Sequence, residues 1–193
     1  MEKNKRLDIE LVENEYFKSE RLLYRPYKLE DLDTVHRLFN ESSRRRWFYF
    51  QEPDCLTKEF ALEQIKNNID KWSKQVNVLE GGSLAMVLKE TGELIGSVGI
   101  GKSIRPDVHL NGLELGYHVA EAHQGKGYAT EGAKAAIEWV IEHCQKIDTY
   151  PIIECHVEHE HWASRRVAEK SGFIFNRSYK YITVYVLNTK PIS

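Results

Sequence analysis

Apolar side chains along this chain switch between helical and strand spacing, which predicts an α/β domain. Between residues 29 and 39 they recur every three or four positions, as on one face of an amphipathic helix. A second helix is expected to begin at Thr57, whose hydroxyl is suited to cap its first turn. Its apolar face comprises Phe60, Ala61, Ile65, Ile69 and Trp72. A short strand, RLLYRPY at 21–27, precedes both helices and is ended by its proline.

From residue 83 the pattern changes to strands. SLAMVLK and LIGSVGI flank a TGE turn and predict a hairpin, and LELGYHV, PIIECHV and two closing strands around 173–175 and 179–187 follow. Helices are expected after LELGYHV and at 162–171, where Gly172 stops the second. We therefore expect a mixed, mostly antiparallel sheet of about seven strands with about four helices. A polar arm over residues 1–18 precedes this single domain at 19–193.

Composition narrows the classes of partner. The chain has 193 residues and a net charge of −2, which allows a sizeable core and gives no reason to expect nucleic acid or an anionic membrane as the main partner. The N-terminus lacks the apolar core of a signal peptide, and no later run approaches the ~18 apolar residues of a membrane span. Three widely spaced cysteines without a CxxC pair argue against disulfides and thiolate zinc. A cytoplasmic location is expected.

The most informative stretch is HQGKG at 123–127, which joins the strand LELGYHV to a helix. Helix N-termini carry unpaired amides and a positive dipole end, which attract phosphate. Gly125 and Gly127 can take positive φ, so amides from Gln124 to Ala129 could turn around a pyrophosphate, with Lys126 adding charge. A glycine turn that binds nothing is the alternative. The P-loop pattern does not fit, and Thr130 stands where the dinucleotide fingerprint needs its third glycine.

The segment 124–129 also matches the Q/R-x-x-G-x-G/A signature of the GNAT superfamily of N-acetyltransferases. Four blocks resemble the RimJ/RimL ribosomal-protein acetyltransferase branch in the family's order and cover most of 19–187: SERLLYRPYKLEDLD, GELIGSVGI, LELGYHVAEAHQGKGYATEG and ASRRVAEKSGF. The resemblance implies acetyl-CoA as cosubstrate, its pyrophosphate on the glycine loop, and a sheet splayed between its fourth and fifth strands to form the cofactor slot. The cofactor-binding residues that it implies are Tyr117, His118, Val119, Gln124, Gly125, Lys126, Gly127, Tyr128, Ala129, Thr130, His161 and Ser164.

Alternation in LELGYHV places Glu114, Gly116 and His118 on one face of the strand. Acetyl transfer to an amine needs a base, because the amine is mostly ammonium at neutral pH. Glu114 is our candidate, and a solvated strand carboxylate is the alternative. Gly116 would let an extended ligand lie close to the backbone.

Many GNAT members use a tyrosine from the helix after the fifth strand to protonate the leaving thiolate, but residues 162–171 contain none. Ser164 falls on the serine of the branch's N-x-x-S pattern and could donate a hydrogen bond to sulfur, or instead cap the helix. His161 occupies the asparagine position of that pattern, which is the clearest departure from the family. An imidazole can still donate a hydrogen bond to the cofactor arm.

Two further clusters of side chains could bind a ligand. HVEHEH at 156–161 invites a metal site, but strand alternation gives no closed tetrahedral set, so no metal is expected. Cys144 and Cys155 are expected in the core. SSRRRWFYF at 42–50 could grip RNA, or its residues Arg44, Arg45, Arg46 and Trp47 could select an anionic acceptor such as an acidic peptide. The alternative leaves the arginines in solvent with Trp47, Phe48 and Phe50 packed beneath.

Together these observations predict an acetyl-CoA-dependent N-acetyltransferase that acts on a primary amine by direct attack in a ternary complex. The acceptor would be a protein N-terminal amine. Three alternatives stay open: a small-molecule amine such as an antibiotic, polyamine or amino acid as acceptor; a non-catalytic acyl-CoA sensor; and an RNA-associated module. A homodimer also stays open.

Overall fold

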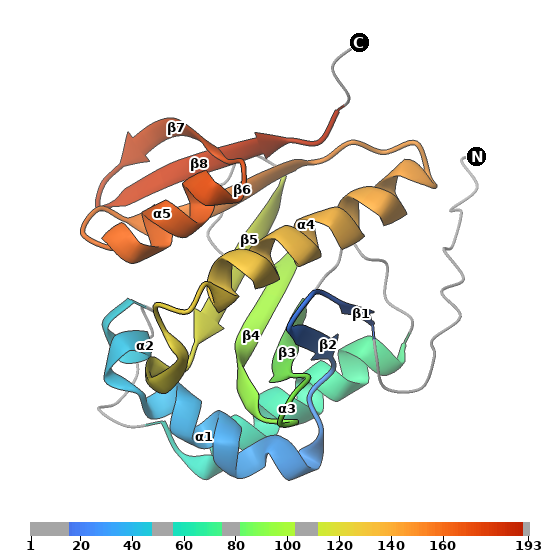
Figure 1. Cartoon of the computed structure of the whole chain (residues 1–193), viewed down its shortest axis with the longest axis vertical. Coiled ribbons are helices and arrows are strands. Elements are labelled where there is room, and N and C mark those ends of the chain that lie inside the picture. The colour runs from blue at the N-terminus through green and yellow to red at the C-terminus, as the bar shows by residue number, and fades with distance from the viewer. Residues whose placement is uncertain (1–15, 48–55, 75–81, 103–111, 191–193) are drawn as a thin grey trace.

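The computed structural model describes residues 16–47, 56–74, 82–102 and 112–190. One sheet has the order β1-β2-β3-β4-β5-β6-β8-β7. Its strands are β1 Phe17–Lys18, β2 Leu22–Arg25, β3 Gly82–Leu88, β4 Leu94–Gly101, β5 Leu113–Val119, β6 Ile152–Glu158, β7 Ile174–Tyr179 and β8 Ile182–Asn188. The α-helices are α1 Leu32–Asn40, α2 Ser42–Trp47, α3 Lys58–Ser73, α4 Tyr128–Gln145 and α5 Trp162–Lys170, with 3-10 turns η1 Leu29–Asp31 and η3 Glu121–His123. In Figure 1, α4 crosses the sheet and α1, α2 and α3 gather at its lower end.

The sheet is mixed and mostly antiparallel, as predicted. Its parallel pair is β5 with β6, and their register extends only over Leu113↔Ile153 and Glu114↔Glu154. Beyond these residues the two strands separate, which confirms the expected splay between the strands LELGYHV and PIIECHV. Strands that separate expose side chains of both faces to one opening.

Two described elements were not predicted. β1 lies in the segment assigned to the polar arm, yet Phe17 pairs with Tyr24 and stacks on its ring at 4.3 Å. Two residues are too few for strand alternation to be visible in a sequence. α2 lies where a connection was expected, and its run of arginines has no amphipathic period.

The first predicted helix begins later than expected. Residues 29–31 form η1, and Leu29, assigned to the buried face, is 57% exposed. The reason lies in Asp31, whose carboxylate accepts from Lys28 N at 2.7 Å and pairs with Arg25 Nη1 at 2.7 Å. These bonds tighten the first turn. α3 begins as predicted, since Thr57 Oγ1 accepts from Phe60 N at 3.2 Å.

The main core lies between the sheet and α4. The stripe of small residues at the start of α4 allows close packing, since a Cβ at Gly132 would lie 2.7 Å from Met86 Sδ. Bulkier residues follow, and Ile137 and Val140 are buried further along the helix. This packing fixes the N-terminus of α4 against the carboxyl end of β5.

The closing strands differ from their predicted bounds: β7 extends to Tyr179, and β8 begins at Ile182. Ile174 and Phe175 of β7 lie on the outer edge strand with 68% and 60% exposure. Within the described part of the chain, none of the helices is both long and apolar enough to span a membrane.

Candidate active site

A cavity of about 470 Å³ opens where β5 and β6 separate. Its walls come from β5, the loop after it, the start of α4, β6 and α5. Residues of both faces of β5 line it, among them Glu114 and His118 from one face and Leu115 and Tyr117 from the other. Residues from both faces of β5 therefore border one opening at the point where the strands separate.

Most of the predicted site residues line this one cavity. They are Glu114, Tyr117, His118, Val119, Gln124, Gly125, Gly127, Tyr128, Ala129, Thr130, His161 and Ser164. Lys126, Arg44, Arg45 and Arg46 are outside the set of lining residues, and the side chain of Trp47 lies outside the described part of the structure. Phe48 and Phe50 also lie outside the described residues.

The glycine loop has the backbone conformation that an anion site requires. Gly125 and Gly127 have φ of 76° and 85°, and Gly127 is the N-cap of α4 without a side-chain capping bond. A Cβ at Gly125 would meet nothing within 4 Å. The first-turn amides of α4 therefore face the cavity with neither a capping side chain nor a Cβ at Gly125 in front of them.

Arg21, just before β2, braces the loop from outside the cavity. Its Nη1 donates to Lys126 O at 3.0 Å, its guanidinium lies 4.4 Å above the Tyr128 ring, and its Nε donates to Glu131 Oε2 at 2.7 Å. Ser19 Oγ and Arg21 N each donate to Glu131 Oε1 at 2.7 Å.

Burial would raise the pKa of the Glu131 carboxyl, but the hydrogen bonds from Arg21 and Ser19 outweigh it and hold the pKa below its ordinary value. The stability that this group contributes is therefore present above the pKa of the unfolded carboxyl. It is lost as the pH falls through the lower, folded value.

Removing the brace should weaken cofactor binding more than it weakens the fold. We expect Arg21→Ala to reduce CoA affinity about 5-fold, because the loop loses the bond to Lys126 O while the exposed ion pair contributes little to stability. Isothermal titration of CoA with a parallel melting curve measures both. Lys134→Ala, an exposed position on α4, is the matched control. Unchanged CoA affinity in Arg21→Ala would show that the loop holds its shape without this contact.

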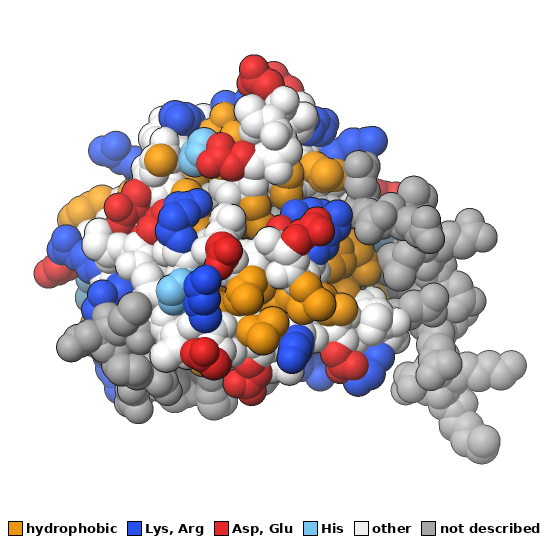
Figure 2. Space-filling model, turned by 90° about the horizontal axis from the view of Figure 1, so that it is seen from below, with side chains coloured by type: hydrophobic (Ala, Val, Ile, Leu, Met, Phe, Trp, Pro, Cys, Tyr) orange, Lys and Arg blue, Asp and Glu red, His pale blue; other side chains and the backbone are white. Residues whose placement is uncertain are grey.

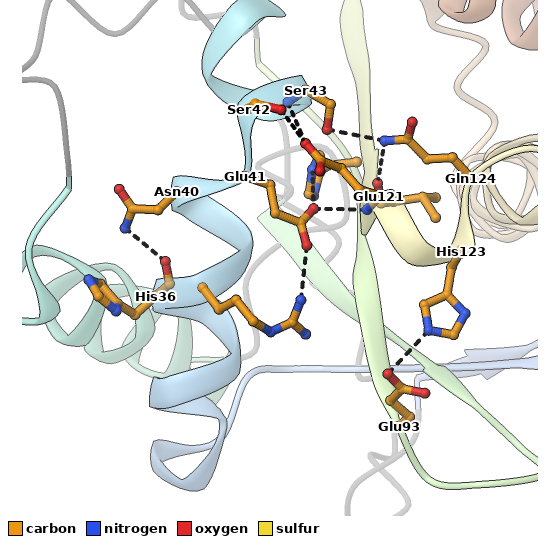
Figure 3. Close-up of polar contacts among 12 residues, drawn as sticks. His36, Asn40, Glu41, Ser42, Ser43, Glu93, Glu121, His123 and Gln124 are labelled. Carbon is orange, nitrogen blue, oxygen red and sulfur yellow. Dashed lines mark hydrogen bonds and ion pairs between the residues drawn. The ribbon is translucent and has the colours of Figure 1, made fainter.

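Gln124 and Glu121 tie the loop to α2, as Figure 3 shows. Gln124 Nε2 donates to Val119 O at 3.0 Å and to Ser43 Oγ at 3.2 Å. Glu121 Oε1 accepts from Ser43 N at 2.8 Å and Ser42 Oγ at 2.7 Å, and these bonds lower the pKa of its carboxyl. The amide nitrogen of Gln124 is thus engaged by the protein itself, and these bonds hold the loop against α2.

The arginines of α2 divide between two environments. Arg44 packs over the Phe39 ring at 3.8 Å, and burial lowers its pKa to about 10. Arg45 and Arg46 are exposed, as the alternative interpretation of this segment expected. Figure 2 shows basic and acidic side chains interspersed on the face seen from below. Among the described residues on that face, charges of both signs alternate over short distances (Figure 2).

Burial, together with the charge of Arg44, lowers the pKa of His118 to about 3. The ring is therefore neutral near pH 7, and its 3.8 Å approach to Glu41 Oε2 is a polar contact rather than an ion pair. His118 can act in the cavity only as a neutral group.

Ser164 does not cap α5. His161 is the N-cap, and its Nδ1 accepts from Ser164 N at 3.4 Å. Burial and the charge of Arg46 lower the pKa of His161 to about 4, so the ring is neutral. A neutral imidazole that accepts through Nδ1 carries its proton on Nε2 and can donate there. His161 thus supplies both a capping acceptor and a donor at the position where the resemblance implies an asparagine.

The Ser164 hydroxyl is instead bonded to a tyrosine. Tyr117 Oη lies 2.7 Å from Ser164 Oγ and 3.0 Å from Ser164 O. Residues 162–171 supply no tyrosine, but β5 brings this phenol to the same helix. Burial raises the pKa of Tyr117 well above its ordinary value, so the phenol keeps its proton. Sequence reasoning assigned Tyr117 to the cofactor site without this partner.

The histidines of 156–161 each have a separate protein contact rather than a shared metal position. His156 Nε2 lies 2.7 Å from Glu154 Oε2, and His159 contacts Thr183 Oγ1 at 3.0 Å. No group of three or more His, Cys, Asp or Glu among the residues with described placement could hold a metal ion. Cys155 is buried beside the cavity, and burial raises its pKa to about 12, which makes it a poor nucleophile.

The sequence profile described as an Acetyltransferase (GNAT) domain matches residues 21–174. The chain belongs to the GNAT family. It is 32% identical over 95 residues to the uncharacterized N-acetyltransferase YjdG of Bacillus subtilis (strain 168), and the match covers 49% of this chain and 52% of that protein. The chain therefore matches only about half the length of this relative.

Solved GNAT structures have the same fold. An acetyltransferase from Agrobacterium tumefaciens str. C58 aligns with a TM-score of 0.65 and 27% identity over 91% of this chain and 98% of the other. RimL, a ribosomal L7/L12 α-N-protein acetyltransferase solved with coenzyme A, aligns with a TM-score of 0.68 over 88% of this chain and 95% of its own. Its identity of 16% supports the fold alone.

Several residues that line the cavity were not predicted from the sequence as site residues. Ser43 from α2, His156 from β6, and Arg166 and Lys170 from α5 all line the cavity. The sequence offered a signal only for Arg166 and Lys170. They are four residues apart on a predicted helix and therefore share one of its faces. The other two depend on contacts between distant segments.

Proposed function

We propose that the protein is an N-acetyltransferase that moves the acetyl group of acetyl-CoA to a primary amine. One observation carries the proposal: the residues that supply the bare amides at the start of α4, the Glu114 carboxylate and the bonded Ser164 hydroxyl all line one cavity, which is bordered by both faces of β5. A pyrophosphate site, a base and a hydroxyl donor are the groups that this reaction needs.

The cosubstrate would enter from the side of α4 and α5. The amides of 124–130 would hold its pyrophosphate, with Lys126 at the rim, and the main chain at His118 and Val119 would pair with the pantetheine arm. His161 Nε2 would donate to that arm, and Arg166 and Lys170 add positive charge to the wall formed by α5. Gly116 leaves room beside the strand, since a Cβ there would meet nothing within 4 Å.

The acceptor amine would enter from the opposite face, where Glu114 lies with 22% of its side chain exposed. Glu114 takes a proton from the ammonium, directly or through water, and the nitrogen lone pair then forms the C–N bond at the thioester carbonyl. The C–S bond breaks, the second N–H proton of the adduct passes to the departing CoA sulfur directly or through water, and the Ser164 hydroxyl donates a hydrogen bond to that sulfur. Holding both substrates in one opening accounts for much of the acceleration.

The Tyr117–Ser164 pair should affect turnover without affecting cofactor binding. We expect Ser164→Ala to lower kcat about 10-fold and Tyr117→Phe about 3-fold, because the first removes the donor and the second only its orienting partner. Stopped-time assays of thiol release at saturating acetyl-CoA measure kcat. Phe at position 117 keeps the buried ring, so its melting temperature serves as the control. Equal activity in all three proteins would exclude the hydroxyl pair from the reaction.

For the acceptor, we propose a protein N-terminal amine, as in the RimJ/RimL branch, in the cytoplasm. The support is the order of the sequence blocks and the fold that the chain shares with RimL. A small-molecule amine is the second candidate, because one GNAT fold accommodates different acceptor grooves.

Two measurements test the function. Calorimetry with CoA reports whether the loop binds the cosubstrate. Thiol release from acetyl-CoA across N-terminal peptides, aminoglycosides, polyamines and amino acids reports the acceptor class. Tight CoA binding with turnover on peptides supports the proposal, and turnover only on a small amine selects the second candidate. Tight binding without turnover on any amine would indicate a sensor, and absent CoA binding would refute the proposal.

A further inference from the structure

A carboxylate, an imidazole and a second carboxylate form a row beside the cavity. His156 Nδ1 lies 3.5 Å from Glu114 Oε1, and His156 Nε2 lies 2.7 Å from Glu154 Oε2. The first distance is longer than an ordinary hydrogen bond and the second is that of a hydrogen bond. One imidazole therefore connects the proposed base to a second acid.

Exposure decreases along this row. Glu114 is 22% exposed at its side chain, whereas the side chains of His156 and Glu154 are 0% exposed. Glu114 and His156 line the cavity, and Glu154 is outside the set of lining residues. Burying ionisable groups is costly unless they are hydrogen-bonded, and the bond between His156 and Glu154 supplies that partner for each.

The topology places the three groups together. Glu114 and Glu154 face each other in the last register pair before β5 and β6 separate, and His156 follows two residues later on the same face of β6. His156 thus stands at the point where the sheet opens. Glu114 itself pairs with Gly101 of β4 and Glu154 of β6, and the residues of β5 that follow it have no partner in β6.

We propose that His156 is a positioning residue for Glu114: held by the buried Glu154, its ring fixes the Glu114 carboxylate in the orientation that receives the acceptor's proton. This inference rests on the proposed function. The ring does not touch the reacting atoms, and it acts only through Glu114. A misplacement of about 1 Å in such a group lowers turnover by up to ~100-fold.

Two variants separate this role from a structural one. The amide nitrogen of glutamine reaches the place of Nε2, and that of asparagine the place of Nδ1. His156→Gln therefore keeps a donor for Glu154 and removes the contact with Glu114. We expect it to melt near the wild-type temperature, with an unchanged KM for acetyl-CoA and a kcat about 10-fold lower. His156→Asn keeps the contact with Glu114 and should retain more turnover despite a lower melting temperature.

The matched control is His159→Gln, which removes a neighbouring histidine that contacts Thr183 and Lys180 O and is outside the cavity-lining set. It should leave kcat unchanged. The inference is overturned if His156→Gln turns over at the wild-type rate. It is equally overturned if kcat follows the melting temperature across both His156 variants, since that pattern indicates a structural role alone.

An NMR experiment tests the contact between His156 and Glu114 without an acceptor and without a His156 variant that must fold. The ring nitrogen chemical shifts of His156, recorded at one pH, should differ between wild type and Glu114→Gln and agree between wild type and Glu138→Gln, an exposed α4 control. Identical shifts in Glu114→Gln would show that the two groups do not interact, and the inference fails. Because this experiment reports on the contact alone, it distinguishes failure of the inference from a failure to find acetyl transfer.

Discussion

Glu114→Gln is expected to lower kcat by ~100-fold or more while the Kd for acetyl-CoA stays within about 2-fold, since general-base catalysis contributes ~100- to ~10,000-fold. Glutamine has nearly the shape of glutamate but does not accept the ammonium proton. Glu114 faces the cavity from the side of the sheet opposite Tyr117 and the loop, so the cosubstrate side of the opening stays intact. Thiol release measures turnover, and calorimetry measures the Kd.

Glu138→Gln, which removes one carboxylate from the exposed side of α4, controls for the change in net charge. If turnover and acetyl-CoA affinity fall together in Glu114→Gln, the residue shapes the site rather than serving as its base. If neither falls, Glu114 has no part in the mechanism. The alternative of a merely solvated strand carboxylate predicts this last result.

Elements with long periodic patterns were predictable from the sequence, and short ones were not. The apolar faces of α4 and α3 each extend over several helical turns, so the spacing of apolar residues identifies both helices. The Thr57 cap marks the start of α3. β1 has two residues and α2 has six, which is too little for a period. They are stabilised by partners far along the chain, as the stacking of Phe17 on Trp139 at 5.1 Å shows.

The site was predictable where function depends on the main chain. Positive φ at Gly125 and Gly127 follows from residue type, and the loop lies where a helix follows a strand. The side chains that support the loop were not predictable, because the partners of Arg21 lie far away in the sequence. Lys126 in the loop is 105 residues from it, and Glu131 on α4 is 110 residues from it. The same reason hid the contact between Tyr117 and Ser164.

The role of His161 could not be predicted from its residue type alone, because it also depends on where the ring lies. Its departure from the family's asparagine was visible in the sequence, but the consequence depended on geometry. The ring caps α5 through Nδ1, which releases Ser164 Oγ for Tyr117. A substitution at one position thus decides what a neighbouring hydroxyl can do.

Replacing both loop glycines should have the largest effect on the cosubstrate. We expect Gly125→Ala combined with Gly127→Ala to weaken CoA binding by ~30- to ~1000-fold, because a left-handed conformation costs a non-glycine residue roughly 1–2 kcal/mol and each 1.4 kcal/mol is tenfold in affinity. A Cβ at either position meets no atom closer than 3.5 Å, so the effect comes from backbone strain rather than collision. A strained loop relaxes, and its amides no longer converge on the pyrophosphate.

The control for this experiment is Gly92→Ala, in the turn between β3 and β4. Gly92 has φ of 71°, and a Cβ there meets nothing within 4 Å, so the substitution imposes similar strain away from the cavity. It should lower the free energy of unfolding by about 1–2 kcal/mol and leave CoA affinity unchanged. If the loop double variant also loses only stability, the amides of 124–129 do not hold the pyrophosphate, and the cosubstrate site must lie elsewhere in the cavity.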